Sequence, residues 1–117
     1  MKGIHEMSDR ELMDYQYEQK EVMQREDDPF RPSRNVTIEQ REAALDALHE
    51  IRLEGWRRGW NGVPTEDRRA DFERFTARNA QRLERAKAIG SIPSIYAMMD
   101  MVRTNEDRIA WIDSHKD

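Results

Sequence analysis

Residues 37–60 read TIEQREAALDALHEIRLEGWRRGW, and this stretch decides the fold. Thr37 followed three residues later by Gln40 is the capping-box signature of a helix N-terminus. At 100° per residue, one face of the predicted helix carries Ile38, Leu45, Leu48, Trp56 and Trp60, and a second apolar side carries Ala44, Ile51 and Gly55. A helix that is apolar on two sides has to be covered on both, so we predict that it forms the centre of the domain.

Helix signals recur on both sides of this centre, whereas no stretch alternates apolar and polar residues for long enough to form a strand. Ser8 with Glu11 is a second predicted capping box. Further boundaries are marked by Thr65 and Asn105 as N-caps and by Gly90 as a C-terminal glycine. We predict a single all-α domain over residues 1–117, a compact bundle of four to five helices at about 8–26, 38–60, 66–89, 93–103 and 106–115. A connection at 27–36, which contains two prolines, separates the first two helices.

The composition narrows the class of protein. The chain has 117 residues, a formal net charge of −4 and no cysteine, which excludes disulfides, thiolate metal sites and cysteine nucleophiles. Only 20 residues are Ile, Leu, Val or Phe, so we expect a thin core. The sequence becomes charged at its start before any apolar run forms, and its longest uncharged run, 88–99, is shorter than the roughly 20 residues that a membrane span needs. We therefore expect a cytoplasmic protein that does not bind membranes.

Charge is segregated along the chain. Residues 1–50 carry 7 basic and 13 acidic side chains, whereas residues 51–90 carry 10 basic and 6 acidic ones. Within the basic segment, an i, i+4, i+8, i+11 spacing places Arg74, Arg78, Arg82 and Arg85 in one narrow strip of the helix predicted at 66–89. Like charges stacked in this way destabilise a helix by a few tenths of a kcal/mol per pair, so the strip predicts an anion nearby.

Two sources could supply that anion. The helix predicted at 8–26 has an acidic strip of its own, and further carboxylates follow it; together these residues are Glu11, Asp14, Glu18, Glu21, Asp27 and Asp28. One interpretation is an internal seam between the acidic and basic helices, although the first and third helices of a simple up-down-up bundle are parallel, which argues against it. The other is a surface that binds the phosphates or carboxylates of a partner. The sequence leaves both open.

A second unusual stretch, EGWRRGWNG at residues 54–62, places two arginines between two tryptophans that are one helical turn apart. Trp and Arg are enriched at interface hot spots, which indicates a binding surface at Arg57, Arg58 and Trp60. The alternative is that the indoles complete the thin core, which we favour for Trp56 and leave open for Trp60. The neighbouring glycines permit close backbone approach.

Catalysis has little support in the residues. The segment from His49 to Leu53 begins like a zinc-protease helix, but Leu53 takes the place of the second histidine, which leaves one metal ligand. The chain has neither a nucleophile elbow nor a phosphate-binding glycine loop. We therefore predict that the protein is not an enzyme and has no catalytic residue, no metal site and no cofactor.

These observations favour a non-catalytic binding protein, a small adaptor or inhibitor that acts through protein-protein contacts, with nucleic-acid-handling machinery as one class of partner. Small acidic helical proteins of this kind are frequent among phage and mobile-element accessory proteins. This association rests on size and composition and not on any particular residue. The predicted partner-binding residues are Arg57, Arg58, Trp60, Arg74, Arg78, Arg82 and Arg85. One alternative is direct DNA or RNA binding through the arginine strip, extended by Arg68. Another is nucleic-acid mimicry by the acidic residues, and a homodimer that completes the thin core also stays open.

Overall fold

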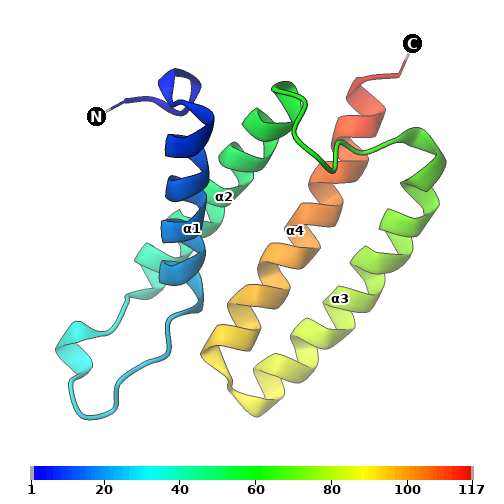
Figure 1. Cartoon of the computed structure of the whole chain (residues 1–117). Helices are drawn as coiled ribbons and strands as arrows, with labels where there is room; N and C mark the ends of the chain where they lie inside the picture. The colour runs from blue at the N-terminus through cyan, green and yellow to red at the C-terminus, as the bar shows by residue number, and fades with distance from the viewer. Residues whose placement is uncertain (1, 117) are drawn as a thin grey trace.

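The computed structural model describes residues 2–116, which form α-helices and short turns without a strand (Figure 1). The four helices are α1 (Asp9–Gln24), α2 (Ile38–Arg57), α3 (Arg69–Ile89) and α4 (Ile92–Ser114). Three 3₁₀ turns lie at Ile4–Glu6, Pro32–Arg34 and Glu66–Arg68. The predicted all-α bundle of four to five helices is thereby confirmed. None of the helices in residues 2–116 is long and apolar enough to cross a bilayer.

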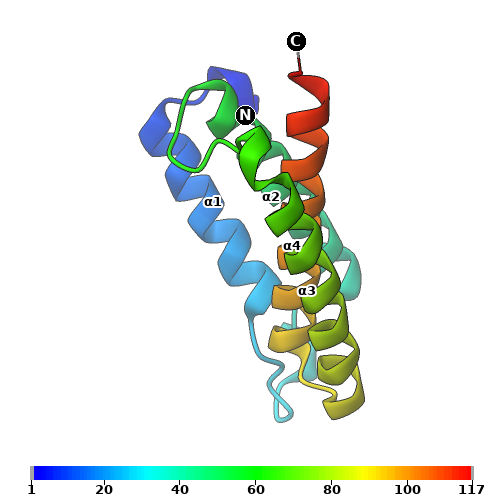
Figure 2. The same ribbon diagram turned by 90° about the vertical axis from the view of Figure 1, so that its right-hand side faces the viewer.

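The helices form two antiparallel hairpins, α1 with α2 and α3 with α4 (Figure 1). Helix α4 packs against all three other helices, whereas α1 and α3 lie on opposite flanks of the molecule. The bundle is flattened, with principal extents of 54 × 37 × 18 Å, and Figure 2 shows it turned by 90°. Its radius of gyration is 15.6 Å, whereas about 13 Å is typical of a domain of this length. A flattened bundle leaves one side of α3 open to solvent.

Local capping explains where the helices begin. The Ser8 hydroxyl accepts a hydrogen bond from the Glu11 amide at 3.1 Å, and the Glu11 carboxylate accepts one from the Ser8 amide at 3.0 Å. Thr37 and Gln40 repeat this reciprocal pair at 3.0 and 2.8 Å. Both predicted capping boxes are therefore confirmed. Gly90 ends α3 in the left-handed region with φ of 81°, a conformation that glycine adopts without steric cost.

Two predicted boundaries are wrong. The helices expected at 93–103 and 106–115 are one continuous helix, α4. Asn105 does not cap a helix, because its amide lies buried in the middle of α4 and donates to the Met101 carbonyl at 3.1 Å. Thr65 makes no side-chain capping hydrogen bond either, since a 3₁₀ turn precedes α3 there. Inside a continuous helix the Asn105 side chain bonds back to the carbonyl four residues earlier and caps no new helix.

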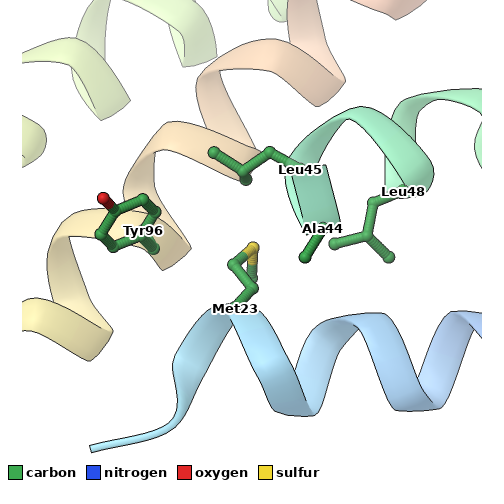
Figure 3. Packing of buried hydrophobic residues seen from close by; sticks show 5 residues of the cluster. All are labelled: Met23, Ala44, Leu45, Leu48 and Tyr96. Atoms are coloured by element: carbon green, nitrogen blue, oxygen red, sulfur yellow. The ribbon is translucent and has the colours of Figure 1, made fainter. Parts of the chain in front are cut away.

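The hydrophobic core lies where α1, α2 and α4 meet. Figure 3 shows its centre, which consists of Met23 from α1, Ala44, Leu45 and Leu48 from α2, and Tyr96 from α4. The core is thin, because the only large side chains with less than 2% exposure in residues 2–116 are Leu12, Met23 and Ile51. Helix α2 is buried on both of its predicted apolar sides, with Ile38 as an exception at 62% exposure in its first turn.

Candidate functional site

Helix α3 turns a row of arginines toward solvent. We call Arg74, Arg78, Arg82 and Arg85 the arginine surface, and all four residues are exposed. The opposite side of α3 buries Phe72, Asn79 and Ala86 and packs against α4. At a rise of 1.5 Å per residue, the arginine surface is about 16 Å long.

The protein itself supplies almost no negative charge to the arginine surface. Arg74 forms an ion pair with Asp71, one turn away on the same helix. Arg78, Arg82 and Arg85 make no hydrogen bond or ion pair with any residue between 2 and 116. Three adjacent guanidinium groups are therefore hydrated by solvent and have no counter-charge from the described chain.

The internal seam with the first helix does not form. Helix α1 packs against α2 and α4 on the flank opposite α3 (Figure 1), and no ion pair in the described chain joins α1 to α3. Glu11 bonds instead to Lys2 at 3.1 Å, and Glu21 bonds to Arg25 within its own helix. The acidic and basic surfaces are thus separate features of the molecule.

The remaining predicted acidic residues differ in their surroundings. Asp14 and Glu18 are exposed and make no ion pair within residues 2–116. Asp27 accepts a hydrogen bond from Arg41 at 3.1 Å, and Asp28 accepts one from the Phe30 amide at 2.9 Å. Among the six predicted acidic residues, only Asp14 and Glu18 in the middle of α1 have no hydrogen-bond or ion-pair partner in the described chain.

Arg58 and Trp60 hold the N-terminal segment against the end of α2. The Arg58 guanidinium donates to the carboxylates of Glu54 at 2.9 Å and Asp9 at 3.0 Å and to the Met7 carbonyl at 2.8 Å. Its hydrogen bond is the largest cause that holds the pKa of Glu54 below the ordinary value. The Trp60 indole donates to Asp9 at 3.3 Å. Both predicted binding residues thus have partners inside the chain, and the more exposed Arg57 also pairs with Glu54, at 3.4 Å.

The sequence reasoning missed a polar network between α2 and α4. Arg52 donates to Asp100 at 2.9 Å and to Asp107 at 2.5 Å, and His49 pairs with the same Asp107 oxygen at 2.8 Å. These partners are about 50 residues apart in the chain, and no local spacing rule connects them. His49 therefore has a carboxylate partner, and no cluster of three metal-ligating side chains exists in residues 2–116.

The pair of His49 and Asp107 borders a cavity of about 340 Å³, which Leu53, Trp111 and His115 also line. The one hydroxyl among the residues that line this cavity, on Ser114, donates to the Trp111 carbonyl at 3.0 Å and contacts the His115 ring. Because Asp107 also binds Arg52, the arrangement is that of a structural ion-pair network. The arginine surface is the stronger candidate for function.

No family model, curated protein or solved structure matches this chain.

Proposed function

We propose that this chain is a non-catalytic binding protein, a small adaptor or inhibitor, that uses the arginine surface to contact an acidic patch on a protein partner in the cytoplasm. The observation that carries the proposal is the exposure of Arg78, Arg82 and Arg85 without an anion from the chain.

The arrangement of these charges supports a binding role. Arg74, Arg78 and Arg82 are stacked at i, i+4 intervals, where like charges disfavour a helix by about 0.2–0.5 kcal/mol per pair. Carboxylates of a partner would remove this repulsion and add bidentate hydrogen bonds, for which the planar guanidinium is suited. The complex would therefore gain both from new ion pairs and from relief of repulsion in the free protein.

The composition of the same face favours a protein over a nucleic acid. Ile89 lies four residues after Arg85 on the exposed side of α3, and it is 81% exposed. The exposed uncharged residues Ala77, Gln81 and Ala88 lie next to the arginines on that side, and the exposed carboxylates of Glu73 and Glu84 lie beyond them. An apolar side chain beside arginines is typical of protein interfaces, whereas a phosphate backbone offers an exposed isoleucine no apolar partner.

Direct binding to DNA or RNA is the second candidate, and one observation favours it. The carboxylates of α1 would repel phosphates if they lay beside the arginine surface, but α1 and α3 occupy opposite flanks (Figure 1). With four arginines engaged, the logarithm of the affinity for duplex DNA would fall against the logarithm of the salt concentration with a slope of about −3.6.

The test compares two double variants with the same change in charge. Arg78→Glu with Arg82→Glu reverses the centre of the arginine surface. The matched control is Arg31→Glu with Arg34→Glu, two exposed arginines in the α1–α2 connection that have no ion pair within residues 2–116. Each protein is used to capture partners from a lysate of the native host, and the captured protein is then purified and titrated directly.

The proposal expects that the charge reversal on α3 weakens the purified complex by at least about tenfold, whereas the control binds like the wild type. Circular dichroism checks that both variants are folded. If the two variants bind the partner equally well, the arginine surface does not carry the interaction. A fluorescence-anisotropy titration with duplex DNA and single-stranded RNA at several salt concentrations then decides for or against the second candidate.

A further inference from the structure

A second concentration of positive charge lies inside the bundle, on α4. Arg108 is partly buried, and its guanidinium lies over the ring of Phe72 with 5.1 Å between the guanidinium carbon and the ring centroid. Its one side-chain hydrogen bond within residues 2–116 is donated to a neutral group, the Asn105 side-chain oxygen, at 2.9 Å. No carboxylate of the described chain pairs with it. This guanidinium is therefore withdrawn from water without a counter-ion.

The surroundings of Arg108 add to this imbalance. Desolvation is the main cause that lowers the pKa of Arg108, and the positive charges of Arg52 and Arg68 lower it further. Arg52 is already neutralised by Asp100 and Asp107, so these carboxylates are committed to another cation. A partly buried cation in such a setting is unfavourable unless an anion joins it.

Two cavities adjoin Arg108 and give an anion room. One has a volume of about 210 Å³ and is lined by Gln16 and Lys20 of α1, by Asn61 of the α2–α3 connection and by Arg108. The Lys20 ammonium and the two amides make no side-chain hydrogen bond elsewhere in residues 2–116. The carboxylate of Asp100 also lines this cavity, where it is bound to Arg52.

The other cavity has a volume of about 150 Å³ and lies beneath the α2–α3 connection. Arg68, Phe72 and Phe75 line it together with Arg108. Arg68 lies over the same Phe72 ring as Arg108, at 5.4 Å, and its nearest carboxylate, Asp71, is 3.7 Å away. Arg108 thus borders both spaces and has no carboxylate partner in either.

We propose that this pair of cavities binds a small molecule that bears a phosphate group, with Arg108 and Lys20 neutralising its charge and Gln16 and Asn61 donating hydrogen bonds to its oxygens. The donors come from α1, the α2–α3 connection and α4, so they surround the space instead of sharing one plane. A phosphate carries close to two negative charges and at least three strong acceptor oxygens, which suits such a shell better than a planar carboxylate does. The volumes fit a pyrophosphate or a small phosphate ester, not a polymer.

The site is independent of the arginine surface, because the two share no residue. The test is an isothermal titration of the full chain with sodium pyrophosphate, with citrate and sodium chloride at matched ionic strength as comparisons. We expect saturable binding of pyrophosphate with one site per chain and a rise in melting temperature, because a ligand that binds the folded state stabilises it.

Two variants test the residues. Arg108→Met keeps the aliphatic stem and removes the charge, and we expect it to weaken pyrophosphate binding at least about tenfold. Its matched control is Arg103→Met on the same helix, because Arg103 pairs with Asp46 outside both cavities. Lys20→Gln, at an exposed position that cannot compromise folding, should weaken binding by a smaller factor.

A structural role for Arg108 predicts something different. If Arg108 only stabilised the fold, the Met variant would melt below the wild type, whereas a ligand-binding role predicts an unchanged or higher melting temperature without ligand. The proposal is overturned if pyrophosphate binds no better than citrate, or if Lys20→Gln and Arg108→Met bind like the wild type. If Arg78→Glu with Arg82→Glu abolished pyrophosphate binding, the anion would bind on α3 and not at Arg108. That result would overturn this proposal without affecting the proposed protein interface.

Discussion

Replacing Arg41 with methionine removes a guanidinium that closes the C-terminal end of α1. Arg41 is 2% exposed and donates to the Met23 carbonyl at 2.9 Å and to the Arg25 carbonyl at 2.6 Å. It also bonds to Asp27 at 3.1 Å and lies 5.5 Å from the centre of the Tyr96 ring. Carbonyls at the end of a helix have no intrahelical partner, so this side chain from α2 supplies what α1 cannot supply itself.

The expected loss of stability in Arg41→Met follows from the groups that lose their hydrogen-bond partner. Asp27 is about half exposed and will be hydrated again, so its bond adds little. The two carbonyls lose hydrogen bonds to a charged donor, each worth about 1.5–3 kcal/mol. We therefore expect Arg41→Met to lower the free energy of unfolding by about 3–6 kcal/mol, the sum for the two carbonyls. A domain of this length is stable by roughly 6–15 kcal/mol, so the loss is a large part of the total.

Urea denaturation followed by circular dichroism measures this loss. With a slope of about 1–3 kcal/mol per molar urea, the midpoint should fall by about 2 M. Arg10→Met is the control, because Arg10 lies exposed on α1 and has no ion pair in residues 2–116, and it should change stability by less than about 0.5 kcal/mol. A loss of under about 1 kcal/mol in Arg41→Met would refute the reasoning that this arginine closes α1.

Three further predictions concern single positions. In Gly55→Ala the new Cβ would lie 2.7 Å from Cε3 of Trp60. We therefore expect a shift in tryptophan fluorescence and a decrease of about 1–3 kcal/mol in the free energy of unfolding. A variant as stable as the wild type would contradict the close packing. The hydrogen bond from Arg69 lowers the pKa of Asp113 to about 2. The Arg69–Asp113 pair should therefore stabilise the folded state fully above about pH 4, and this stabilisation should disappear as the pH falls toward 2. An ordinary Asp113 pKa in an NMR titration would contradict this prediction. Arg78→Ala should leave the melting temperature unchanged or slightly higher, because the side chain has no partner in the described chain, and a clear decrease would show that it has one.

The sequence predicts the helices well because their signals are local. The reciprocal bonds of Ser8 with Glu11 and of Thr37 with Gln40 join residues three apart, and they form as predicted. The close approach expected near the glycines is also found, since the Trp60 indole lies directly against Gly55. The failed N-cap at Asn105 has a local signal too, but a buried position inside α4 gives its amide other partners.

The candidate sites were predictable only in part. The spacing of Arg78 and Arg82 places them on one face of α3, and exposure at that face follows from the apolar residues on the opposite side. Arg58 and Trp60 gave the same compositional signal, yet both bind Asp9, which lies about 50 residues away in the chain. Arg108 gave no signal at all, because its lack of a counter-ion depends on which carboxylates Arg52 occupies.

The sequence by itself thus determined the helical class, the two capping boxes and the segregation of charge along the chain, but it divided α4 into two helices. Tertiary structure alone decided which charges meet between helices. Helix α1 carries the carboxylates that could have neutralised α3, but the flattened bundle places the two helices on opposite flanks (Figure 1). The physical reason is that helix formation depends on bonds within four residues, whereas ion pairing between helices depends on the packing and rotation of whole helices, which the buried apolar side chains set.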